Sequence, residues 1–310
     1  TAAIGPSVIR YLRKMKFGQK ILEIGPKWHM NKQNIPTMGG FMFIIGIALA
    51  VILGGLITGT LSVHALAILG LSVAYGAVGL VDDYAKIKKK ENAGLTPRQK
   101  LVLQILVAAV FILVLFLESD GLPSLMIPFT GISIDLPWPV YIIFAAFVIV
   151  GADNAVNLTD GIDGLAASVT VPVAVFFAAV GARIGNTGVT IFAGALAGGL
   201  LGFLIYNFNP AKVFMGDTGS LFLGGAVAGM AFACDMPLIL LLVGLIYIIE
   251  TLSVILQVTY FKATHGKRLF KMAPIHHHFE MCGWGEKRIV LTFTAVTIVL
   301  CLAAYFVALP

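Results

Sequence analysis

Two adjacent carboxylates, Asp82 and Asp83, end a long apolar run of this 310-residue sequence. An ionised carboxylate at the centre of a bilayer costs roughly 2.5–3.5 kcal/mol on insertion scales, so acids beside membrane helices need a reason. Neighbouring side chains point about 100° apart on a helix, so one carboxylate can face a metal ion or a phosphate while the other holds a basic partner. Lys86 has the spacing of that partner. The alternative is a charged cap at the membrane interface.

A second polar cluster fills residues 153–164, DNAVNLTDGIDG. Asn154, Asn157, Asp160 and Asp163 recur every three residues at the end of an apolar run, and glycines follow to turn the chain. This spacing predicts one concave patch of amide and carboxylate groups. An EF-hand is excluded, because the alternating acidic ligands and the terminal Glu of that loop are absent. A loop that only caps the helix is the alternative.

A third cluster, NFNPAKVFMGDTGS at residues 207–220, precedes another apolar run. Thr218 or Ser220 can cap the helix that starts here, and the amides of a helix N-terminus favour an anion. Asp217 beside such amides predicts a metal ion that bridges the protein and a phosphate. An ordinary N-cap aspartate is the simpler alternative.

Three adjacent histidines, His276, His277 and His278, lie in a basic segment with the sequence PIHHHFE at residues 274–280. Imidazoles in such a segment can donate hydrogen bonds to the oxygens of a diphosphate or a sugar. Zinc binding is an alternative, although neither H-E-x-x-H nor a paired cysteine motif accompanies the histidines. A solvated loop is another.

All four clusters lie on one face if the apolar runs alternate across a membrane, and there they can converge. Mg²⁺ prefers oxygen ligands and usually binds together with phosphates. It can hold a diphosphate in line for attack and neutralise the leaving group. Neither GxxxxGK[ST] nor GxGxxG occurs, so a nucleotide would not be held by a P-loop or a Rossmann turn. The clusters therefore predict metal-assisted phosphate chemistry at one membrane face.

Long apolar runs must position these clusters. The sequence is 59% hydrophobic and only 12% charged, whereas a soluble domain carries about 25% charged residues. About 20 apolar residues span a bilayer. We expect spans at 38–58, 63–81, 101–117, 139–156, 165–182, 188–206, 219–234, 237–261 and 289–309, with Thr1–Leu12 as the end of a truncated one. The fold class is then an all-α polytopic membrane protein of about ten helices, in one domain over residues 1–310.

The basic residues indicate the orientation of the chain. All but one of the 21 Lys and Arg residues lie in segments on one side of the expected spans, and the exception is Arg183. These segments are 10–37, 82–100, 157–164, 207–218 and 262–288. Cationic loops stay on the cytoplasmic side, so we expect the four clusters there and both termini outside. The net charge of +6 then reflects topology and attraction to anionic membrane lipids, not a nucleic-acid partner.

Two further features concern the outer side and the cysteines. The segment 118–138 is rich in Pro, Gly and Ser and partly alternates polar with apolar residues, which predicts a short periplasmic β-hairpin. Cys234, Cys282 and Cys301 have no paired spacing, so a disulfide framework or a zinc ribbon is not expected.

Taken together, four sequence elements resemble the bacterial phospho-N-acetylmuramoyl-pentapeptide transferase family, within the polyprenyl-phosphate N-acetylhexosamine-1-phosphate transferase superfamily. They are VDDYAK at 81–86, NAVNLTDGIDGLA at 154–166, FMGDTGS at 214–220 and PIHHHFE at 274–280. PTMGG at 36–40 resembles a further element, at the start of the family's second span. The resemblance covers essentially the whole chain in order. Asn34-Ile35 departs from the Gly-Thr that usually precedes PTMGG.

The resemblance implies transfer of phospho-MurNAc-pentapeptide from UDP-MurNAc-pentapeptide to undecaprenyl phosphate with Mg²⁺. The products would be lipid I and UMP, in the first membrane step of peptidoglycan synthesis. It also implies a homodimer in the bacterial cytoplasmic (inner) membrane, with the active site on the cytoplasmic side. Carried over by motif, Asp217 would be the principal Mg²⁺ ligand. Asp82 and Asp83 would serve the metal or the attack by the lipid phosphate, and Asp82 would be the second ligand.

Substrate contacts also follow from the resemblance. Phe214 would supply a stacking face for uridine and Asp163 would read the uracil. Lys86 and Lys100 would lie near phosphate, and Asn207 near the metal. Lys32 and Thr37 would lie at the nucleoside entrance. The remaining residues implied in nucleotide and sugar binding are Asn154, Asn157, Asp160, His276, His277 and His278, of which His276 would also be catalytic.

Two other functions stay open at the level of sequence. A relative that transfers GlcNAc-1-phosphate would use the same aspartates, but the triple His favours the muramoyl substrate. Membrane carboxylates also mark the ion path of a transporter, but transporter sites lie near the midplane and are often built from inverted repeats. Here the acids gather at one face. The order of bond making is also open, because Asp82 or Asp83 could be a base, or an aspartate a nucleophile.

Overall fold

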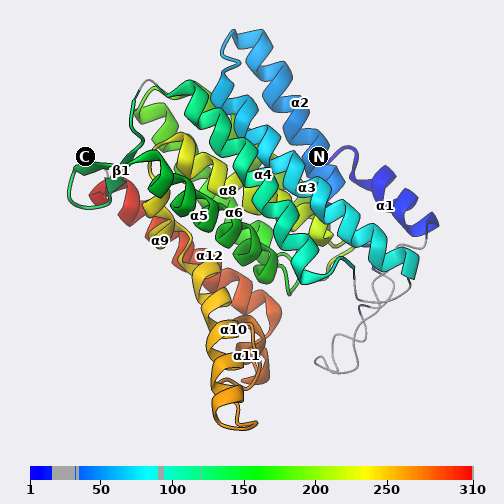
Figure 1. Ribbon diagram of the computed structural model, residues 1–310. Coiled ribbons are helices and arrows are strands. Elements are labelled where there is room, and N and C mark those ends of the chain that lie inside the picture. The colour runs from blue at the N-terminus through cyan, green and yellow to red at the C-terminus, as the bar shows by residue number, and fades with distance from the viewer. Residues whose placement is uncertain (16–31, 33–34, 90–93, 120, 309–310) are drawn as a thin grey trace.

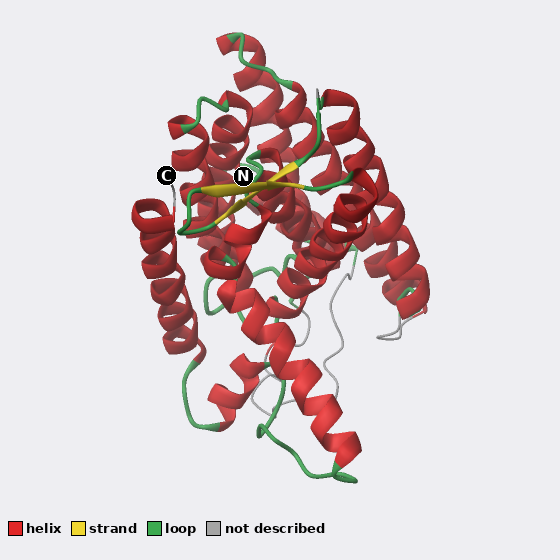
Figure 2. Ribbon diagram, turned by 60° about the vertical axis from the view of Figure 1, so that its left-hand side comes forward, coloured by secondary structure: helices red, strands yellow, loops and turns green. Residues whose placement is uncertain are grey.

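The computed structural model describes residues 1–15, 32, 35–89, 94–119 and 121–308. Its helices form a bundle with one small sheet, and one helix projects from the bundle (Figures 1 and 2). The long helices are α2 (Gly40–Thr58), α3 (Val63–Lys89), α4 (Pro97–Glu118), α5 (Trp138–Thr159), α6 (Leu165–Arg183), α7 (Thr187–Asn207), α8 (Gly216–Ala233), α10 (Leu245–Ala263) and α12 (Glu286–Ala303). The shorter ones are α1 (Gly5–Lys14), α9 (Leu240–Val243) and α11 (Ile275–Met281), and a π-helical turn follows at Ala304–Ala308.

Eight helices in the described part of the chain are long and apolar enough to cross a membrane: α2 to α7, α10 and α12. The predicted spans at these places are confirmed as helices. Helix α8 is not among the eight, because its first turn is polar, and α1 has only 10 residues. The all-α class is confirmed, whereas the total of about ten spans and the outward position of both termini stay predictions. Most of the predicted inner segment 10–37 lies outside the described residues.

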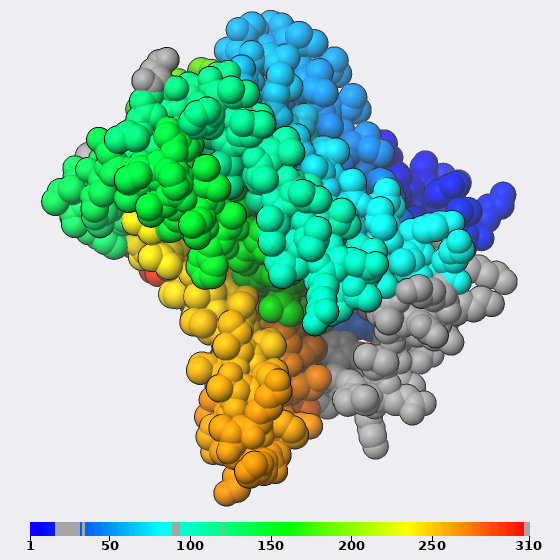
Figure 3. Space-filling view, viewed as in Figure 1, coloured from blue at the N-terminus to red at the C-terminus, as the bar shows by residue number. Residues whose placement is uncertain are grey.

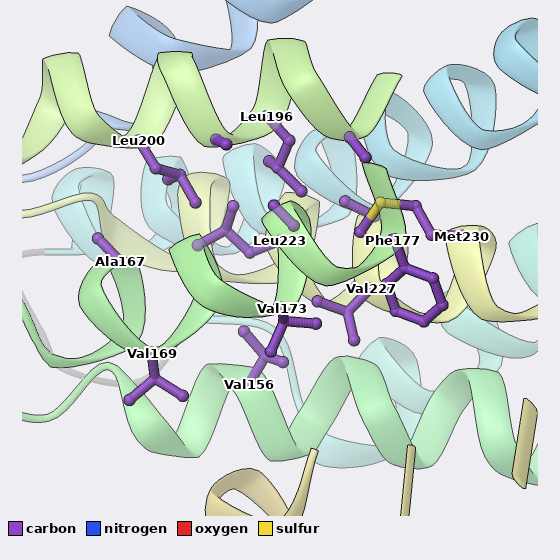
Figure 4. Close-up of a cluster of buried hydrophobic side chains, with 14 of the residues drawn as sticks. Val156, Ala167, Val169, Val173, Phe177, Leu196, Leu200, Leu223, Val227 and Met230 are labelled. Carbon is purple, nitrogen blue, oxygen red and sulfur yellow. The ribbon is translucent and has the colours of Figure 1, made fainter. Parts of the chain in front are cut away.

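Helix α8 is the centre of the bundle, and from Thr218 to Ala233 all of its residues are buried. It packs against α3 and α5, and it contacts α2, α6 and α7 as well. Small residues permit this, because a Cβ at Gly79 of α3 would overlap the backbone of Asp217, and a Cβ at Gly224 would overlap Asp153 of α5. Figure 4 shows Leu223 and Val227 of α8 among apolar side chains of α5, α6 and α7.

One predicted span differs from the structure. Residues 237–261 do not form a single helix: a 3-10 turn at Pro237–Ile239 leads into α9, and α10 begins only after Gly244. Gly244 has φ −97° and ψ 10°, and a Cβ there would overlap the carbonyl oxygen of Leu240. Because glycine tolerates this close approach, the chain changes direction here. Beyond the break, α10 leaves the bundle with α11 packed beside it (Figures 1 and 3).

The predicted hairpin is confirmed. Strands β1 (Ser124–Ile127) and β2 (Ile132–Asp135) pair antiparallel, with Ser124 opposite Asp135 and Ile127 opposite Ile132. The amide of Met126 donates to the carbonyl of Asp235, at 3.2 Å, which joins the sheet to the connection between α8 and α9. The sheet lies at the opposite ends of α5 and α8 from the acidic residues described next (Figure 2).

Candidate active site

Three carboxylates meet where α3 ends and α8 begins. Asp82 and Asp83 come from the last turns of α3, and Asp217 comes from the first turn of α8. One oxygen of each lies within 4.8 Å of an oxygen of both others. We call these three residues the acidic centre. Asp82 and Asp83 are 4% exposed, so their charges lie largely away from solvent.

Asp83 caps α8 from a neighbouring helix. Its Oδ2 accepts the backbone N–H of Thr218 at 2.9 Å and the hydroxyl of Thr218 at 2.7 Å, and its Oδ1 accepts the N–H of Asp217 at 3.2 Å. These are amides that a helix leaves unpaired at its start. The expectation that Thr218 or Ser220 caps the helix was therefore wrong. Ser220 instead donates to the carbonyl of Gly216, at 3.1 Å.

Two lysines bind the acidic centre. Lys86 Nζ lies 2.6 Å from Asp82 Oδ2 and 2.9 Å from Asp217 Oδ2. Lys100, from the first turn of α4, places its Nζ 3.2 Å from the same oxygen of Asp217. The predicted same-face pair of Asp82 with Lys86 is thus present. Lys86 also crosses to α8, which sequence spacing alone did not indicate.

Asn157, near the end of α5, completes this group. Its Nδ2 donates to Asp217 Oδ1 at 2.9 Å and to Ser220 Oγ at 2.7 Å, and its Oδ1 accepts from Lys100 at 3.3 Å. Four helices, α3, α4, α5 and α8, therefore supply the side chains around Asp217. The result is a dense alternation of carboxylate, ammonium and amide groups, the kind of donor and acceptor set that binds phosphate and metal together.

A second charged cluster lies around Asp163, which is 2% exposed. Lys32 Nζ is 2.6 Å from Asp163 Oδ1 and 2.7 Å from Glu286 at the start of α12. The other Asp163 oxygen accepts the amide N–H of Ala211 at 2.9 Å and Asn209 Nδ2 at 3.2 Å. Glu286 Oε2 accepts from Asn209 Nδ2 and from the Asp163 amide, each at 3.2 Å. The cluster joins Lys32, the α5–α6 turn, the α7–α8 loop and α12.

Three further predicted residues border these clusters. Asp160, at the end of α5, donates its backbone N–H to the carbonyl of Asn157 at 3.2 Å, and its carboxyl has no hydrogen bond to a side chain of the described residues. Burial of its carboxyl, together with nearby carboxylates, Asp217 above all, raises the pKa of Asp160 well above its ordinary value. Phe214 is half-buried, and its amide donates to the carbonyl of Pro36 at 2.9 Å. Thr37 is buried beside Gly216.

The three histidines have different surroundings. His276 is fully buried, and its Nδ1 lies 2.9 Å from Glu250 Oε2 on α10. His277 is paired with Glu280, at 2.6 Å. His278 Nδ1 accepts the amide N–H of Lys271 at 3.1 Å, at the surface. The rings of His276 and His277 nevertheless lie against each other, with 4.2 Å between their centroids, whereas the ring of His278 contacts Phe270 and Phe279. The predicted contacts of the three histidines with substrate stay predictions.

Two predicted residues point away from the acidic centre. Asn154 Nδ2 donates to Gln104 Oε1 of α4 at 3.0 Å and to the carbonyl of Val150 at 2.8 Å. Asn207 is buried and donates to the carbonyl of Val213 at 2.9 Å. Asn207 thus closes the loop between α7 and α8. Asn207 was predicted to lie near a metal, but the hydrogen bond of its side chain is to Val213 and not to a residue of the acidic centre.

Sequence reasoning missed several polar residues that the structure ties to the site. Glu250 was visible as an acid inside an apolar run, a signal of function in a membrane helix. Asn209 lies in the loop between α7 and α8 and Glu286 is the first residue of α12, and neither carries a motif by itself. Their role appears only when Lys32 and Asp163 meet, across 131 positions of sequence.

The acidic centre suits a hard cation. All three residues offer carboxylate oxygens, and the ligand set contains no sulfur or imidazole, which favours Mg²⁺ over zinc. The ammonium of Lys86 lies between oxygens of Asp82 and Asp217, so a positive group is already stabilised at that position. Any of the three carboxylates could hold such an ion, and the expectation that Asp217 and Asp82 are its ligands stays a prediction.

Comparison with known proteins gives a consistent result. The model of the glycosyl transferase family 4 matches residues 65–235, a range that contains the whole acidic centre. A phospho-N-acetylmuramoyl-pentapeptide-transferase of Listeria welshimeri is 47% identical over 95% of this chain and 90% of its own length. Its namesakes in Clostridium perfringens and Clostridium acetobutylicum are 49% and 48% identical, over 97% of this chain and 93% of theirs.

Proposed function

Because the chain belongs to glycosyl transferase family 4 and, within it, to the phospho-N-acetylmuramoyl-pentapeptide transferases, we propose that it transfers phospho-MurNAc-pentapeptide from UDP-MurNAc-pentapeptide to undecaprenyl phosphate. The products are lipid I and UMP. The protein is a multi-pass membrane protein with eight apolar helices in its described part. It is therefore suited to a reaction between a nucleotide sugar and a polyprenyl phosphate.

The acidic centre with its two lysines is the observation that most directly supports this proposal. Exchange of a sugar phosphate between two phosphorylated partners requires cationic groups for the phosphates and oxygen ligands for a metal. Asp82, Asp83 and Asp217 supply the oxygens, and Lys86 and Lys100 supply the cations within 3.2 Å of Asp217. No ion-coupled transport is needed to explain this set of contacts.

Asp217 and Asp82 would hold Mg²⁺, which supplies charge neutralisation on the diphosphate and on the UMP leaving group. Asp83 has a different part in the proposal, because three hydrogen-bond donors of α8 already bind its carboxylate. It fixes where α8 begins and hence where the Asp217 carboxylate lies.

The lysines of the centre bind phosphate oxygens of the two substrates. A lysine ammonium is a compact charge on a flexible stem, so Lys86 and Lys100 can turn from Asp217 toward a phosphate without a change in the backbone. Asn157 donates to Asp217 and accepts from Lys100, so it holds the carboxylate and the ammonium in fixed positions relative to each other.

The nucleotide sugar binds on the side of the α5–α6 turn. Asp163, held by Lys32, Asn209 and the amide of Ala211, presents a fixed carboxylate for the uracil. Phe214 offers an aromatic face, and Asp160 is close enough to Asp163 and to Asp217 for the charges of both to raise the pKa of its carboxyl. A nucleoside bound at Asp163 thus directs its diphosphate toward Asp217.

The site faces the cytoplasm in this proposal. Every lysine of the two clusters belongs to the basic segments that the positive-inside rule places in the cytoplasm. UDP-linked precursors are water-soluble, so a cytoplasmic opening at the ends of α3, α5 and α8 is required. A homodimer in the bacterial cytoplasmic membrane stays an expectation from the family.

Substrate choice tests the function. Detergent-solubilised protein is incubated with undecaprenyl phosphate, Mg²⁺ and either UDP-MurNAc-pentapeptide or UDP-GlcNAc, and the release of UMP and the lipid product are measured. We expect turnover with UDP-MurNAc-pentapeptide. Turnover with UDP-GlcNAc alone would contradict the proposal in favour of a GlcNAc-1-phosphate transferase.

A further inference from the structure

Glu250 and His276 form a buried pair beneath the α5–α6 turn. Both side chains have 0% exposure, and His276 Nδ1 lies 2.9 Å from Glu250 Oε2. Glu250 comes from α10, the helix that leaves the bundle, whereas His276 comes from the first turn of α11. The pair therefore joins two elements of the projecting arm beside the site.

The far side of the His276 ring carries a polar atom without a partner. Its Nε2 is buried and makes no hydrogen bond to any described residue. Most buried polar atoms in proteins are paired, so an exception requires an explanation. Packing alone does not call for a histidine here, because an apolar side chain of similar size would leave no buried nitrogen unpaired.

Nε2 points at the turn that carries two predicted nucleotide-sugar residues. A Cβ added at Gly161 would overlap the imidazole, with Nε2 and Cε1 as its nearest atoms. Gly161 has no positive φ, so it is the neighbouring ring, not the backbone conformation, that demands a glycine. Asp160 precedes Gly161 directly, and Asp163 follows two residues later. The turn thus packs directly against the ring of His276, so the position of the ring determines the position of the turn.

We propose that Glu250 is a positioning residue of the nucleotide-sugar site and acts through His276. Its carboxylate accepts the Nδ1–H of His276, which fixes the tautomer with an unprotonated Nε2 and holds the Nε2 edge of the ring against Gly161. The turn with Asp160 and Asp163 is placed by this contact. The inference rests on the proposed function, because it assigns nucleotide-sugar binding to that turn.

A merely structural role for Glu250 leads to a different expectation. Helix α10 exposes Leu252, Ile255 and Leu256 on its surface, each about half exposed, and such a surface faces lipid. If Glu250 only anchored α10, its loss would alter the lipid side of the enzyme and the binding of undecaprenyl phosphate. If it positions His276, its loss alters the nucleotide-sugar side.

The first measurement separates these expectations by kinetics on the full chain. Glu250→Leu removes the acceptor, and Glu250→Gln keeps an oxygen that accepts from Nδ1–H. We expect Glu250→Leu to lower kcat/KM for UDP-MurNAc-pentapeptide about tenfold, as for one lost buried hydrogen bond, while KM for undecaprenyl phosphate stays within about twofold of wild type. Glu250→Gln should recover most of the loss. Glu118→Gln, at the exposed far end of α4, is the matched control, for which we expect no effect. A rise in KM for the lipid alone would overturn the proposal.

A second measurement does not depend on activity. Wild-type protein and Glu250→Leu are labelled with ¹⁵N-histidine, and the His276 signals are assigned by their loss in His276→Gln. We expect the Nδ1–H form of His276 in wild type and a mixture of tautomers in Glu250→Leu. A neutral Nε2–H form in wild type would overturn the proposal even if the enzyme is fully active. Conversely, if the expected signals are found in a protein that shows no transferase activity, the contact between Glu250 and His276 is supported and the proposed function is contradicted.

A double-mutant cycle completes the test. If Glu250 acts through His276, then Glu250→Leu should cause little additional loss in a His276→Gln background. Gly161→Ala should reproduce the kinetic effect of Glu250→Leu from the other side of the ring, because the added methyl displaces His276 or the turn. Additive losses of Glu250→Leu and His276→Gln would show independent roles and contradict the inference.

Discussion

At the scale of the residue, Asp217 shows how many partners one carboxylate can have. Its oxygens contact Lys86 from α3, Lys100 from α4 and Asn157 from α5. The alternation of the apolar runs predicted that Asp82 and Asp217 lie on one membrane face, and only the resemblance to a known family predicted that they share one site. Spacing could not predict that Asp83 would cap α8, because a cap supplied by another helix depends on how the two helices pack.

Asp217→Ala should abolish UMP release, with a loss of about a hundredfold or more, the scale of removing a preorganised charged group from an active site. The carboxylate is the shared partner of both lysines, and no other described side chain replaces it. Size-exclusion chromatography and thermal unfolding check that the variant folds. Asp235→Asn, at the other end of α8, is the matched control, and retained turnover in Asp217→Ala would exclude Asp217 from the mechanism.

Chelation tests the metal ligands. Removal of divalent ions with EDTA should stop turnover, and Mg²⁺ should restore it. In Asp82→Asn the Mg²⁺ concentration for half-maximal activity should rise about tenfold or more, because a neutral amide oxygen is a weaker ligand than a carboxylate. A Glu118→Gln variant titrated in parallel should match wild type. An unchanged Mg²⁺ requirement in Asp82→Asn would remove Asp82 from the ligand set.

Lys32 and Glu286 offer a test of the nucleotide side. Lys32→Met leaves the buried carboxylate of Asp163 and the partly buried carboxylate of Glu286 without their cation, so KM for UDP-MurNAc-pentapeptide should rise about tenfold. Glu286→Gln keeps the contact with Asn209 and removes one charge, so its effect should be smaller. Equal KM values in Lys32→Met and wild type would show that the ion pair does not shape the site.

At the scale of the element, polar contacts join α4 and α5 at two levels that lie one helical turn apart: Lys100 at one level, and at the other Gln104, which also accepts from Asn154. Lys100 meets Asn157, and one turn deeper Gln104 Nε2 donates to Asp153 Oδ2 at 2.6 Å. Asp153 and Gln104 are buried, at 0% and 1% exposure. The deeper contact fixes the register of the two helices, which brings Lys100 and Asn157 to the same height beside Asp217.

Removal of one partner of the deeper contact should therefore affect stability and activity together. Gln104→Leu leaves the buried Asp153 without its side-chain donor, and the apparent Tm should fall by about 2–4 °C for each kcal/mol lost. The double variant Gln104→Leu with Asp153→Leu should recover stability, since replacing both partners by apolar groups can be nearly neutral and Asn154, which also donates to Gln104, keeps its bond to the carbonyl of Val150. Thermal unfolding in detergent measures both. A double variant less stable than Gln104→Leu would contradict this reading.

The helices themselves were largely predictable from the sequence, because length and hydrophobicity are local properties. Each of the predicted spans from 38–58 to 219–234 overlaps a helix closely. The break at Gly244 was not predicted, because the run 237–261 is apolar on both sides of it and only packing of α9 reveals the turn. Glu286 and Asn209 escaped prediction for the same reason: their partners are distant in sequence.

At the scale of the whole molecule, the polar chemistry gathers at one end of an apolar bundle. The acidic centre, the Asp163 cluster and the histidines all lie at the ends of α3, α5, α8 and α11 that the basic segments flank. The basic composition, which alone would suit a nucleic-acid partner, thus has a simpler explanation in membrane orientation.

The native cysteines can test that orientation. Cys282, beside α11, is exposed, whereas Cys234 and Cys301 are buried. A membrane-impermeant maleimide should label Cys282 in inside-out vesicles and spare it in intact spheroplasts. Cys282→Ser is the control that should abolish the signal. Labelling from the outside would place the histidine segment, and with it the proposed site, on the wrong side of the membrane.

The central position of α8 has a consequence for biogenesis. The ribosome delivers α2 to α7 first, and with them Asp82, Asp83, Lys100 and Asn157. Helix α8 begins with a polar turn and is rich in glycine, so its transfer into lipid as an isolated helix is only weakly favourable. Its stable insertion therefore depends on packing between the helices that precede it in the chain. Insertion of α8 is therefore the maturation step that turns a nascent, inactive bundle into one with a complete acidic centre.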